Sequence, residues 1–417
     1  MDREGLYIAH RQIKAALQSL LFYVFRIFPV KRRKIVITTI EGTTGFSCNP
    51  KYIVLELLKQ NHSLPEDKRF EIVWLVNDME KQFPEGIRKV HNTLKNRAYE
   101  LTTAGLWIDN SRKQLEVRKR KGQIYLQTWH AKLGFKPTCL DRGASFPRIA
   151  YLVSKHDSEL VDYWLSNSDW YDRTLERGSL YTGKTLRTGS PRCDILLNEV
   201  SAQRNRVRTR YGLSDKIKLM MLCPTFRGGS QGIDREISQG AHLPDIQMLL
   251  SQMKKRFGGE WAALLRLHPQ LTARGIESLL SIPEWLTDRV IDISKEDDMY
   301  EILAGCDAFL TDYSSAAFDA AVMRIPIFLY CDDYEDYEGE RGRLLWDLRK
   351  MPFPFASNEK ELETQTSSFH EDSYRNALDQ LFSDTGMVED GKAAKRVVDH
   401  LLKMSSEPNY ADQKTVS

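Results

Sequence analysis

Three short groups of polar residues each follow a stretch that reads as an apolar β-strand. The first group spans residues 129–132, the second 224–227 and the third 266–269. Ligands of parallel α/β sheets bind beyond the carboxyl ends of the strands, which is where these groups stand. Their arginines offer donors to phosphate oxygens, and His130 and His268 can hold or move a proton near neutral pH. We therefore expect chemistry on a phosphorylated substrate.

A fourth group lies in residues 307–341. An apolar strand runs into Thr311 and Asp312, after which Ser314 and Ser315 open a short helix. Hydroxyls and unpaired backbone N–H groups at a helix start suit the phosphates of an activated donor. The alternative is a serine-capped helix after a buried strand, with no ligand.

The rest of the chain alternates strand-like and helix-like stretches, as an open parallel sheet requires. Two series are expected, with strands at 35–40, 71–77, 105–109 and 123–128, and then at 217–223, 262–268, 289–293, 307–311 and 325–330. The Arg-rich stretch 201–210 reads as the connection between them. The fold class predicted is α/β, with two doubly wound, Rossmann-like domains at residues 35–200 and 201–404.

Residues 1–34 are predicted to form an amphipathic, membrane-associating helix. Its apolar face recurs at helical spacing and consists of Leu17, Leu20, Leu21, Val24, Phe25 and Phe28. Basic residues flank the face, as an interfacial helix on anionic lipid would have, and the run is too short to span a bilayer. The alternative is a helix docked on its own core. Residues 405–417 read as a flexible tail.

Composition narrows the function classes. With 41% hydrophobic and 28% charged residues the chain reads as a soluble, globular protein, and a net charge of +3 gives no reason to expect nucleic acid as a partner. Six scattered cysteines without a CxxC pair predict reduced thiols and no structural zinc. Acidic residues near 312–340 read as solvated or helix-capping groups. We expect neither a metal nor a cofactor.

Five motifs in order resemble the CDP-glycerol glycerophosphotransferase family of teichoic acid primases and polymerases. They cover most of residues 120–365 and read QTWHAKLGFK (127–136), SNSDWYDRTL with TGSPRCDILLN (166–175, 188–198), PTFRGG (224–229), LLRLHP (264–269) and TDYSSAAFD with YEGERG (311–319, 337–342). The resemblance implies a GT-B architecture and a peripheral enzyme on the cytoplasmic side of the cell membrane. It also implies transfer of glycerol phosphate from CDP-glycerol to a hydroxyl of a lipid-linked saccharide or polyol-phosphate acceptor, releasing CMP.

Site residues follow from the same resemblance. His130 and His268 match the two family histidines flanking the donor pyrophosphate. The hypothesis makes His130 the base, and His268, Arg192 and the helix start at Ser314 the stabilisers of the leaving phosphate. Other positions expected to contact substrate are Trp129, Lys132, Thr225, Arg227, Arg266, Asp312, Ser314, Ser315, Glu340 and Arg341.

One departure from the family concerns the segment after His130, where many members carry glycine and this chain has Ala131 and Lys132. A side chain there could alter acceptor or donor preference. No extra N-terminal domain is evident, so a single-addition enzyme or a capsule-type transferase is also open. Three alternatives stand beside the CDP-glycerol transferase: a CDP-ribitol-using enzyme, a GT-B glycosyltransferase using a nucleotide sugar, and a non-enzymatic binding module.

Overall fold

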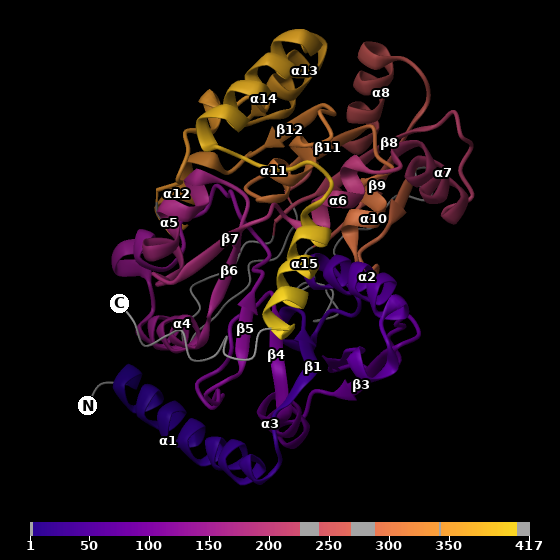
Figure 1. Cartoon of the computed structure of the whole chain (residues 1–417). Helices are drawn as coiled ribbons and strands as arrows, with labels where there is room; N and C mark the ends of the chain where they lie inside the picture. The colour runs from indigo at the N-terminus through magenta and orange to yellow at the C-terminus, as the bar shows by residue number, and fades with distance from the viewer. Residues whose placement is uncertain (1–2, 226–241, 268–287, 342, 407–417) are drawn as a thin grey trace. The chain divides into compact units, whose positions relative to one another are not determined.

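The computed structural model describes residues 3–225, 242–267, 288–341 and 343–406, without the side chains of residues 338–341, 405 and 406. The chain divides into two compact units, each with its own parallel sheet (Figure 1). The described residues of 1–130, 146–194 and 388–417 form the first unit. Those of 131–145 and 195–387 form the second.

The first unit is built on a seven-stranded parallel sheet with the order β3-β2-β1-β4-β5-β6-β7. The strands are β1 (Lys31–Thr38), β2 (Glu71–Val76), β3 (Ile87–His91), β4 (Ala104–Asp109), β5 (Ile124–Gln127), β6 (Tyr163–Ser166) and β7 (Lys184–Arg187). The chain builds outward from β1 to β3 and then returns to the other side of β1. The switch point of this sheet, where ligands of doubly wound folds bind, therefore lies between β1 and β4.

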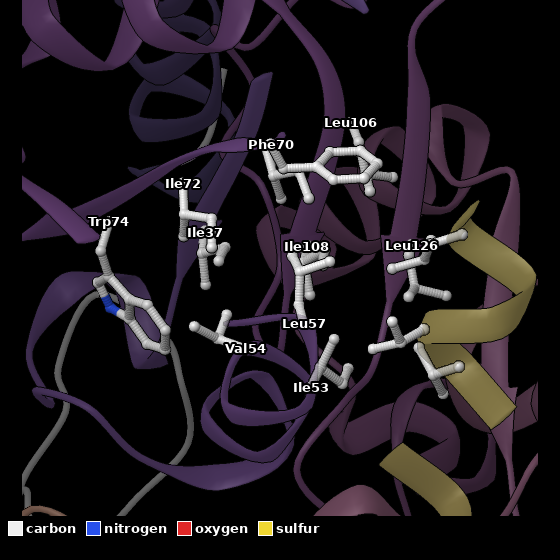
Figure 2. Close-up of a cluster of buried hydrophobic side chains, with 14 of the residues drawn as sticks. Ile37, Ile53, Val54, Leu57, Phe70, Ile72, Trp74, Leu106, Ile108 and Leu126 are labelled. Atoms are coloured by element: carbon white, nitrogen blue, oxygen red, sulfur yellow. The ribbon is translucent and has the colours of Figure 1, made fainter. Parts of the chain in front are cut away.

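Strand residues alternate between two apolar layers, as the pleat of a sheet requires. Ile35 and Ile37 of β1 point into one layer, which helices α2 (Cys48–Ser63) and α15 (Ala393–Ser406) cover (Figure 2). Val36 points into the other layer, to which helices α1 (Arg3–Val24), α3 (Leu94–Thr103) and α5 (Asp169–Ser179) contribute side chains. The continuous apolar strands seen in the sequence are explained by this two-sided burial.

The other helical segments of the first unit lie before, between and after its strands. They are α1 (Arg3–Val24), η1 (Phe25–Ile27), η2 (Ile40–Gly42), η3 (Glu66–Lys68), α3 (Leu94–Thr103), α4 (Arg148–Leu160), α5 (Asp169–Ser179) and η5 (Pro191–Cys193). Helix α6 (Asp194–Leu197) begins at the last residue before the chain passes to the second unit.

The second unit holds a six-stranded parallel sheet with the order β10-β9-β8-β11-β12-β13. Its strands are β8 (Lys218–Cys223), β9 (Trp261–Leu265), β10 (Val290–Asp292), β11 (Ala308–Thr311), β12 (Ile327–Tyr330) and β13 (Phe355–Ala356). By the same logic as in the first unit, its switch point lies between β8 and β11. Its helical segments are η4 (Cys139–Ser145), α7 (Val200–Arg210), α8 (Ile246–Phe257), α10 (Met299–Leu303), α11 (Ala316–Ala321), α12 (Tyr334–Arg341), η8 (Leu348–Lys350), α13 (Glu359–Ser367) and α14 (Glu371–Thr385).

The predicted α/β class with two doubly wound halves is confirmed, and each predicted strand corresponds to an observed one. Three short strands of the first unit, β3, β6 and β7, and β13 of the second were not predicted. Residues 201–210, which were predicted to connect the two domains, lie in helix α7 within the second unit. Arg208 of that helix is buried and donates hydrogen bonds to the carboxylate of Asp307 and the carbonyl of Gly305.

The C-terminal helix does not pack in the domain to which it was predicted to belong. Helix α15 falls within the range 201–404 that was assigned to the second domain, yet it packs in the first unit. The cause is local: the carboxylate of Asp194 accepts hydrogen bonds from the backbone N–H groups of Ala393 and Ala394, and Val397 and Val398 join the core under α2. A helix start capped from a residue two hundred positions away cannot be seen in the sequence.

Helix α1 has two apolar faces. Ile8, Ala15 and Phe22 are buried, and Phe22 packs into the core of the first unit. The opposite side exposes a stripe at helical spacing that continues into η1, made of Leu6, Ile13, Leu17, Leu20, Val24 and Ile27. Within the predicted apolar face, Leu21 and Phe25 pack on the core, whereas Leu17, Leu20, Val24 and Phe28 are exposed. The helix thus docks on its own core and still presents an apolar surface.

Candidate functional site

The loops that follow β1 and β4 meet at the switch point of the first unit. The side-chain oxygen of Asn110 accepts the backbone N–H of Ile40 at 2.8 Å, and the hydroxyl of Ser111 accepts the N–H of Glu41 at 3.0 Å. Ile40 and Glu41 have positive φ angles of 43° and 57°, a region that disfavours a β-branched residue such as isoleucine. The β4 loop therefore holds the β1 loop in a conformation that it would not adopt alone.

His130 lies at this switch point. Its Nδ1 atom is 2.8 Å from the backbone carbonyl oxygen of Asn110, which can only accept a hydrogen bond. Nδ1 therefore carries a proton, and in the neutral imidazole the lone pair is on Nε2. His130 is an exposed residue. A histidine oriented in this way can accept a proton at Nε2 or, when protonated, donate from it.

The residue before it, Trp129, also has a positive φ angle, of 50°. A non-glycine residue in this region costs roughly 1–3 kcal/mol and persists only where neighbours hold it. The Gln127 side chain accepts the Trp129 N–H at 2.9 Å, and the Asn49 side chain donates to the Trp129 carbonyl at 2.8 Å. The indole packs beside the His130 ring, with centroids 4.5 Å apart, and below the guanidinium of Arg112.

Arg192 is almost fully buried, and its guanidinium donates a hydrogen bond to the backbone carbonyl of His130. It also lies 3.5 Å from the sulfur of Cys48. These contacts support the main chain of His130 directly. The expected contact of Arg192 with the leaving phosphate remains a prediction.

A buried polar layer lies under the β4 loop. Asp109 pairs with Lys113 and accepts the N–H and hydroxyl of Ser111. Asp157, which has no exposed surface, accepts the Lys113 N–H at 2.8 Å and the Tyr125 hydroxyl at 3.0 Å. Burial raises the pKa of Asp157 to about 6, although these hydrogen bonds oppose the shift. These contacts support the loop that carries Asn110.

The switch point of the second unit is organised around a carboxylate. Asp312, directly after β11, accepts the backbone N–H of Thr225 at 3.0 Å and the Thr225 hydroxyl at 2.9 Å. It also accepts the N–H of Tyr313 at 2.7 Å, and its exposure is 1%. Thr225 and Asp312, which were predicted to contact the donor, therefore contact each other, and the loops after β8 and β11 are joined.

Ser314 and Ser315 follow at the start of α11. The Ser314 hydroxyl accepts the N–H of Ala316 at 3.2 Å, whereas Ser315 makes no capping hydrogen bond through its side chain. Helix α11 has six residues, so the dipole at its start comes from fewer than two turns. Anion binding here would depend on hydroxyl and N–H groups more than on the dipole.

The segment after His130 packs within the second unit. A side chain at Gly134 would lie 3.5 Å from the Cβ of Ser315, the Gly134 carbonyl accepts the indole N–H of Trp346, and Phe135 packs on Phe318. Lys132 in this segment is buried, with 4% exposure. The covalent neighbours His130 and Ala131 thus belong to different units.

Arg266 is held by main-chain groups. One terminal nitrogen, Nη1, donates to the carbonyls of Ile293 at 3.0 Å and Glu296 at 2.6 Å. These bonds tie the loop after β9 to the segment after β10. Its predicted contact with substrate is neither supported nor opposed by them.

The side-chain positions of four predicted site residues are not described. Arg227 and His268 lie outside the described residues, and Glu340 and Arg341 are in α12, whose side chains from residue 338 onward are not described.

One group of metal-ligating type occurs in the described part of the chain. Nδ1 of His242 lies 2.6 Å from a carboxylate oxygen of Asp332, and Asp333 completes a group whose ligand atoms lie within 4.8 Å of one another. The Tyr313 hydroxyl donates to Asp333 at 2.9 Å. These contacts account for the carboxylates as partners of protein groups, and we assign no metal here.

The structure brings His130, Trp129 and Arg192 together in the first unit, and Thr225 and Asp312 together in the second. It adds three amide side chains that the sequence reasoning missed, namely Asn49, Asn110 and Gln127. Asn110 could have been found, because it directly follows β4 as His130 follows β5. Asn49 gives no such signal, since it sits in the first turn of a helix.

Two parallel, doubly wound units with polar groups at both switch points define an α/β fold of the GT-B type. The family described as CDP-Glycerol:Poly(glycerophosphate) glycerophosphotransferase matches residues 20–403, and the chain belongs to it.

Individual relatives agree with this assignment. A teichoic acid poly(glycerol phosphate) polymerase of Staphylococcus epidermidis is 25% identical over 392 residues, which cover 90% of this chain and 51% of that protein. Another, of Bacillus spizizenii, is 25% identical over 414 residues, 96% of this chain and all of that protein. The chain thus spans about half the length of the first relative. A solved structure of a variant of the wall teichoic acid polymerase TagF has the same fold, with a TM-score of 0.77 and 21% identity over 97% of this chain and 99% of that one.

Proposed function

We propose that the protein transfers glycerol phosphate from CDP-glycerol to a hydroxyl of a lipid-linked or polymer acceptor and releases CMP, in teichoic acid or capsule polymer synthesis. Family membership supports the reaction class. The observation that carries the proposal is the geometry of His130, whose Nδ1 donates to the Asn110 carbonyl at a sheet switch point. This contact orients Nε2 as the proton acceptor.

The proposed step is a single phosphoryl transfer. An acceptor hydroxyl attacks the phosphorus of the glycerol phosphate group, its proton passes to Nε2 of His130, and the bond from phosphorus to the CMP oxygen breaks. The electron pair leaves with CMP. In a loose transition state the main requirement is to stabilise negative charge, and removal of the acceptor proton matters less. Cationic groups near the leaving phosphate are therefore at least as important as the base. We assign that role to His268, Arg192 and Arg227.

We also assign roles to those residues of the second unit that are predicted to contact the donor. Ser314 and Ser315 offer hydroxyl and N–H groups to a phosphate, and Glu340 with Arg341 is assigned to the nucleotide. Asp312 is a negative group that would repel a phosphate. Because it is saturated by donors from Thr225 and Tyr313, we assign it the task of holding the Thr225 loop.

The test is release of CMP with a lipid-linked acceptor present, from CDP-glycerol, CDP-ribitol and a nucleotide sugar in parallel. We expect acceptor-dependent release from CDP-glycerol. His130→Ala should lower it at least a hundredfold, about 2.7 kcal/mol of transition-state stabilisation, while His62→Ala, at an exposed position of α2, should leave it unchanged.

Other outcomes of this assay would redirect the proposal. Preference for CDP-ribitol would change the donor and keep the mechanism. Consumption of a nucleotide sugar without any CMP would replace the proposal with a glycosyltransferase. Full activity of His130→Ala would remove the histidine from the mechanism.

We further propose that the protein binds the cytoplasmic face of an anionic membrane through α1. The exposed apolar stripe of that helix supports this, with Leu17 63% and Ile27 78% exposed. Basic residues precede and follow it in the sequence, including Arg3 and Lys31, and Lys14 lies within its range. No helix in the described part of the chain is both long enough and apolar enough to cross a bilayer.

Sedimentation with vesicles tests this surface. Leu17→Glu should weaken binding to vesicles containing phosphatidylglycerol about tenfold or more, because it removes an apolar contact and adds repulsion. Gln12→Glu adds the same charge at another exposed position of α1 and should cost less. Equal binding of wild type and Leu17→Glu would exclude the stripe as the membrane contact.

A further inference from the structure

Asn49 makes the connection between His130 and Arg192 in the first unit. Its side chain has no exposed surface. Its Nδ2 atom donates to the carbonyl oxygens of Trp129 at 2.8 Å and Thr128 at 3.3 Å, and its Oδ1 atom accepts the backbone N–H of Arg192 at 3.2 Å. Only this orientation of the amide fits, because the reverse would set oxygen against two carbonyls and nitrogen against an N–H group.

The contacts of Asn49 close a ring of interactions around His130. Asn49 holds the carbonyl of Trp129, the residue with φ 50° directly before His130. It also holds the main chain of Arg192, whose guanidinium in turn donates to the carbonyl of His130. The position of the imidazole is thus set on both sides by one buried amide that does not itself contact the ring in any described interaction.

From this geometry we propose that Asn49 is a positioning residue for the transfer reaction, acting through His130 and Arg192. The inference rests on the proposed function. Catalysis by a positioned base depends steeply on placement, since a shift of about 1 Å can cost about a hundredfold in rate. Removing Asn49 would let the Thr128–His130 turn relax from its strained conformation and would move both side chains at once.

The chain offers a matched control in the same helix. Asn61, near the end of α2, also uses both ends of its amide on main-chain groups, with Oδ1 accepting the Phe70 N–H at 2.7 Å and Nδ2 donating to the Phe70 carbonyl at 3.2 Å. Asn61→Ala should therefore lower thermal stability as Asn49→Ala does. It should leave the turnover of the folded enzyme unchanged, because no described contact links Asn61 to His130.

The experiment measures kcat and KM for CDP-glycerol at a temperature where all variants are folded. We expect Asn49→Ala to lower kcat at least tenfold, with KM within about threefold, and Asn61→Ala to change neither. Asn49→Asp keeps the acceptor for Arg192 but sets a carboxylate oxygen against the Trp129 carbonyl, so it should be no better than Asn49→Ala. In the His130→Ala background, Asn49→Ala should cost clearly less than it does in the wild type, because only its effect through Arg192 remains.

Three results would overturn the inference: an equal loss for Asn61→Ala, an equal loss for Asn49→Ala with and without His130, or wild-type turnover of Asn49→Ala. If no variant, wild type included, releases CMP, the proposed function fails and a second measurement decides. In that case the ring resonances of His130, assigned with His130→Asn in protein labelled at histidine, should shift in Asn49→Ala and stay in place in Asn61→Ala. Unchanged resonances in Asn49→Ala would refute a positioning role.

Discussion

The two switch points are built with different chemistry for the same task. In the first unit, the loops after β1, β4 and β5 are joined by neutral amide side chains, and the charged groups Asp109, Lys113 and Asp157 lie buried beneath them. In the second unit, the loops after β8 and β11 are joined by a carboxylate at the switch point itself.

The two switch points therefore differ in the charge of the groups that join their loops. The amides of Asn49 and Asn110 add no net charge to the loops that they join. A carboxylate makes stronger hydrogen bonds than an amide. Both carboxylate oxygens of Asp312 accept hydrogen bonds. The first unit thus has a neutral frame of amides, and the second has a charged frame centred on Asp312.

The largest effect is expected from removing the carboxylate of the second unit. Asp312→Ala should lower kcat/KM about a hundredfold, because the Thr225 loop loses all of its described side-chain support. Asp312→Asn keeps an acceptor for the Thr225 and Tyr313 N–H groups and should stay within tenfold. Steady-state assays of CMP release check both, with Asp245→Ala, which removes an exposed helix cap, as the control. Equal losses for the alanine and asparagine variants would show that charge, and not support, is what matters there.

The buried charge of the first unit should appear in the pH dependence of stability. With its pKa raised to about 6 in the folded protein, Asp157 binds more protons folded than unfolded between about pH 4 and pH 6. Its contribution to the free energy of unfolding therefore falls as pH rises through that range, by about 3 kcal/mol in all. Asp157→Asn should remove this dependence. Urea unfolding of both proteins at several pH values measures the difference, and a constant difference across the range would contradict the assignment.

The smallest effect is expected from a single amide of the first unit. Asn110→Ala removes the acceptor for Ile40 but keeps the backbone carbonyl that holds His130, so kcat should fall only about fivefold. Asn96→Ala, at an exposed amide of the same unit, serves as the control. A loss as large as that of Asp312→Ala would mean that the neutral frame is as indispensable as the charged one.

Much of the fold was predictable from the sequence. Short apolar runs such as 71–77 and 307–311 correspond to β2 and β11, because strands buried on both faces are apolar throughout. Short, amphipathic or partly exposed strands such as β3 and β7 were not predicted, because a few alternating residues resemble a loop. Helix α15 was placed in the other domain because its cap, Asp194, is remote in sequence.

The candidate site divides in the same way. His130, Trp129, Thr225 and Asp312 were found because each follows a strand end, a position set by local sequence and by the polarity of parallel sheets. That Thr225 and Asp312 bind each other could not be found, because hydrogen bonds between loops depend on which strands are neighbours.

The sequence by itself determined the class of fold, the strand ends that carry polar groups and the family of the chain. Only the tertiary structure decided which nitrogen of His130 carries the proton, that Asn49 and Asn110 hold its loops, and that α1 exposes one apolar face while docking the other. The physical reason is the range of the interactions. Apolar periodicity is written residue by residue along the chain, whereas a buried hydrogen bond is formed by groups that meet only after the sheet has been assembled.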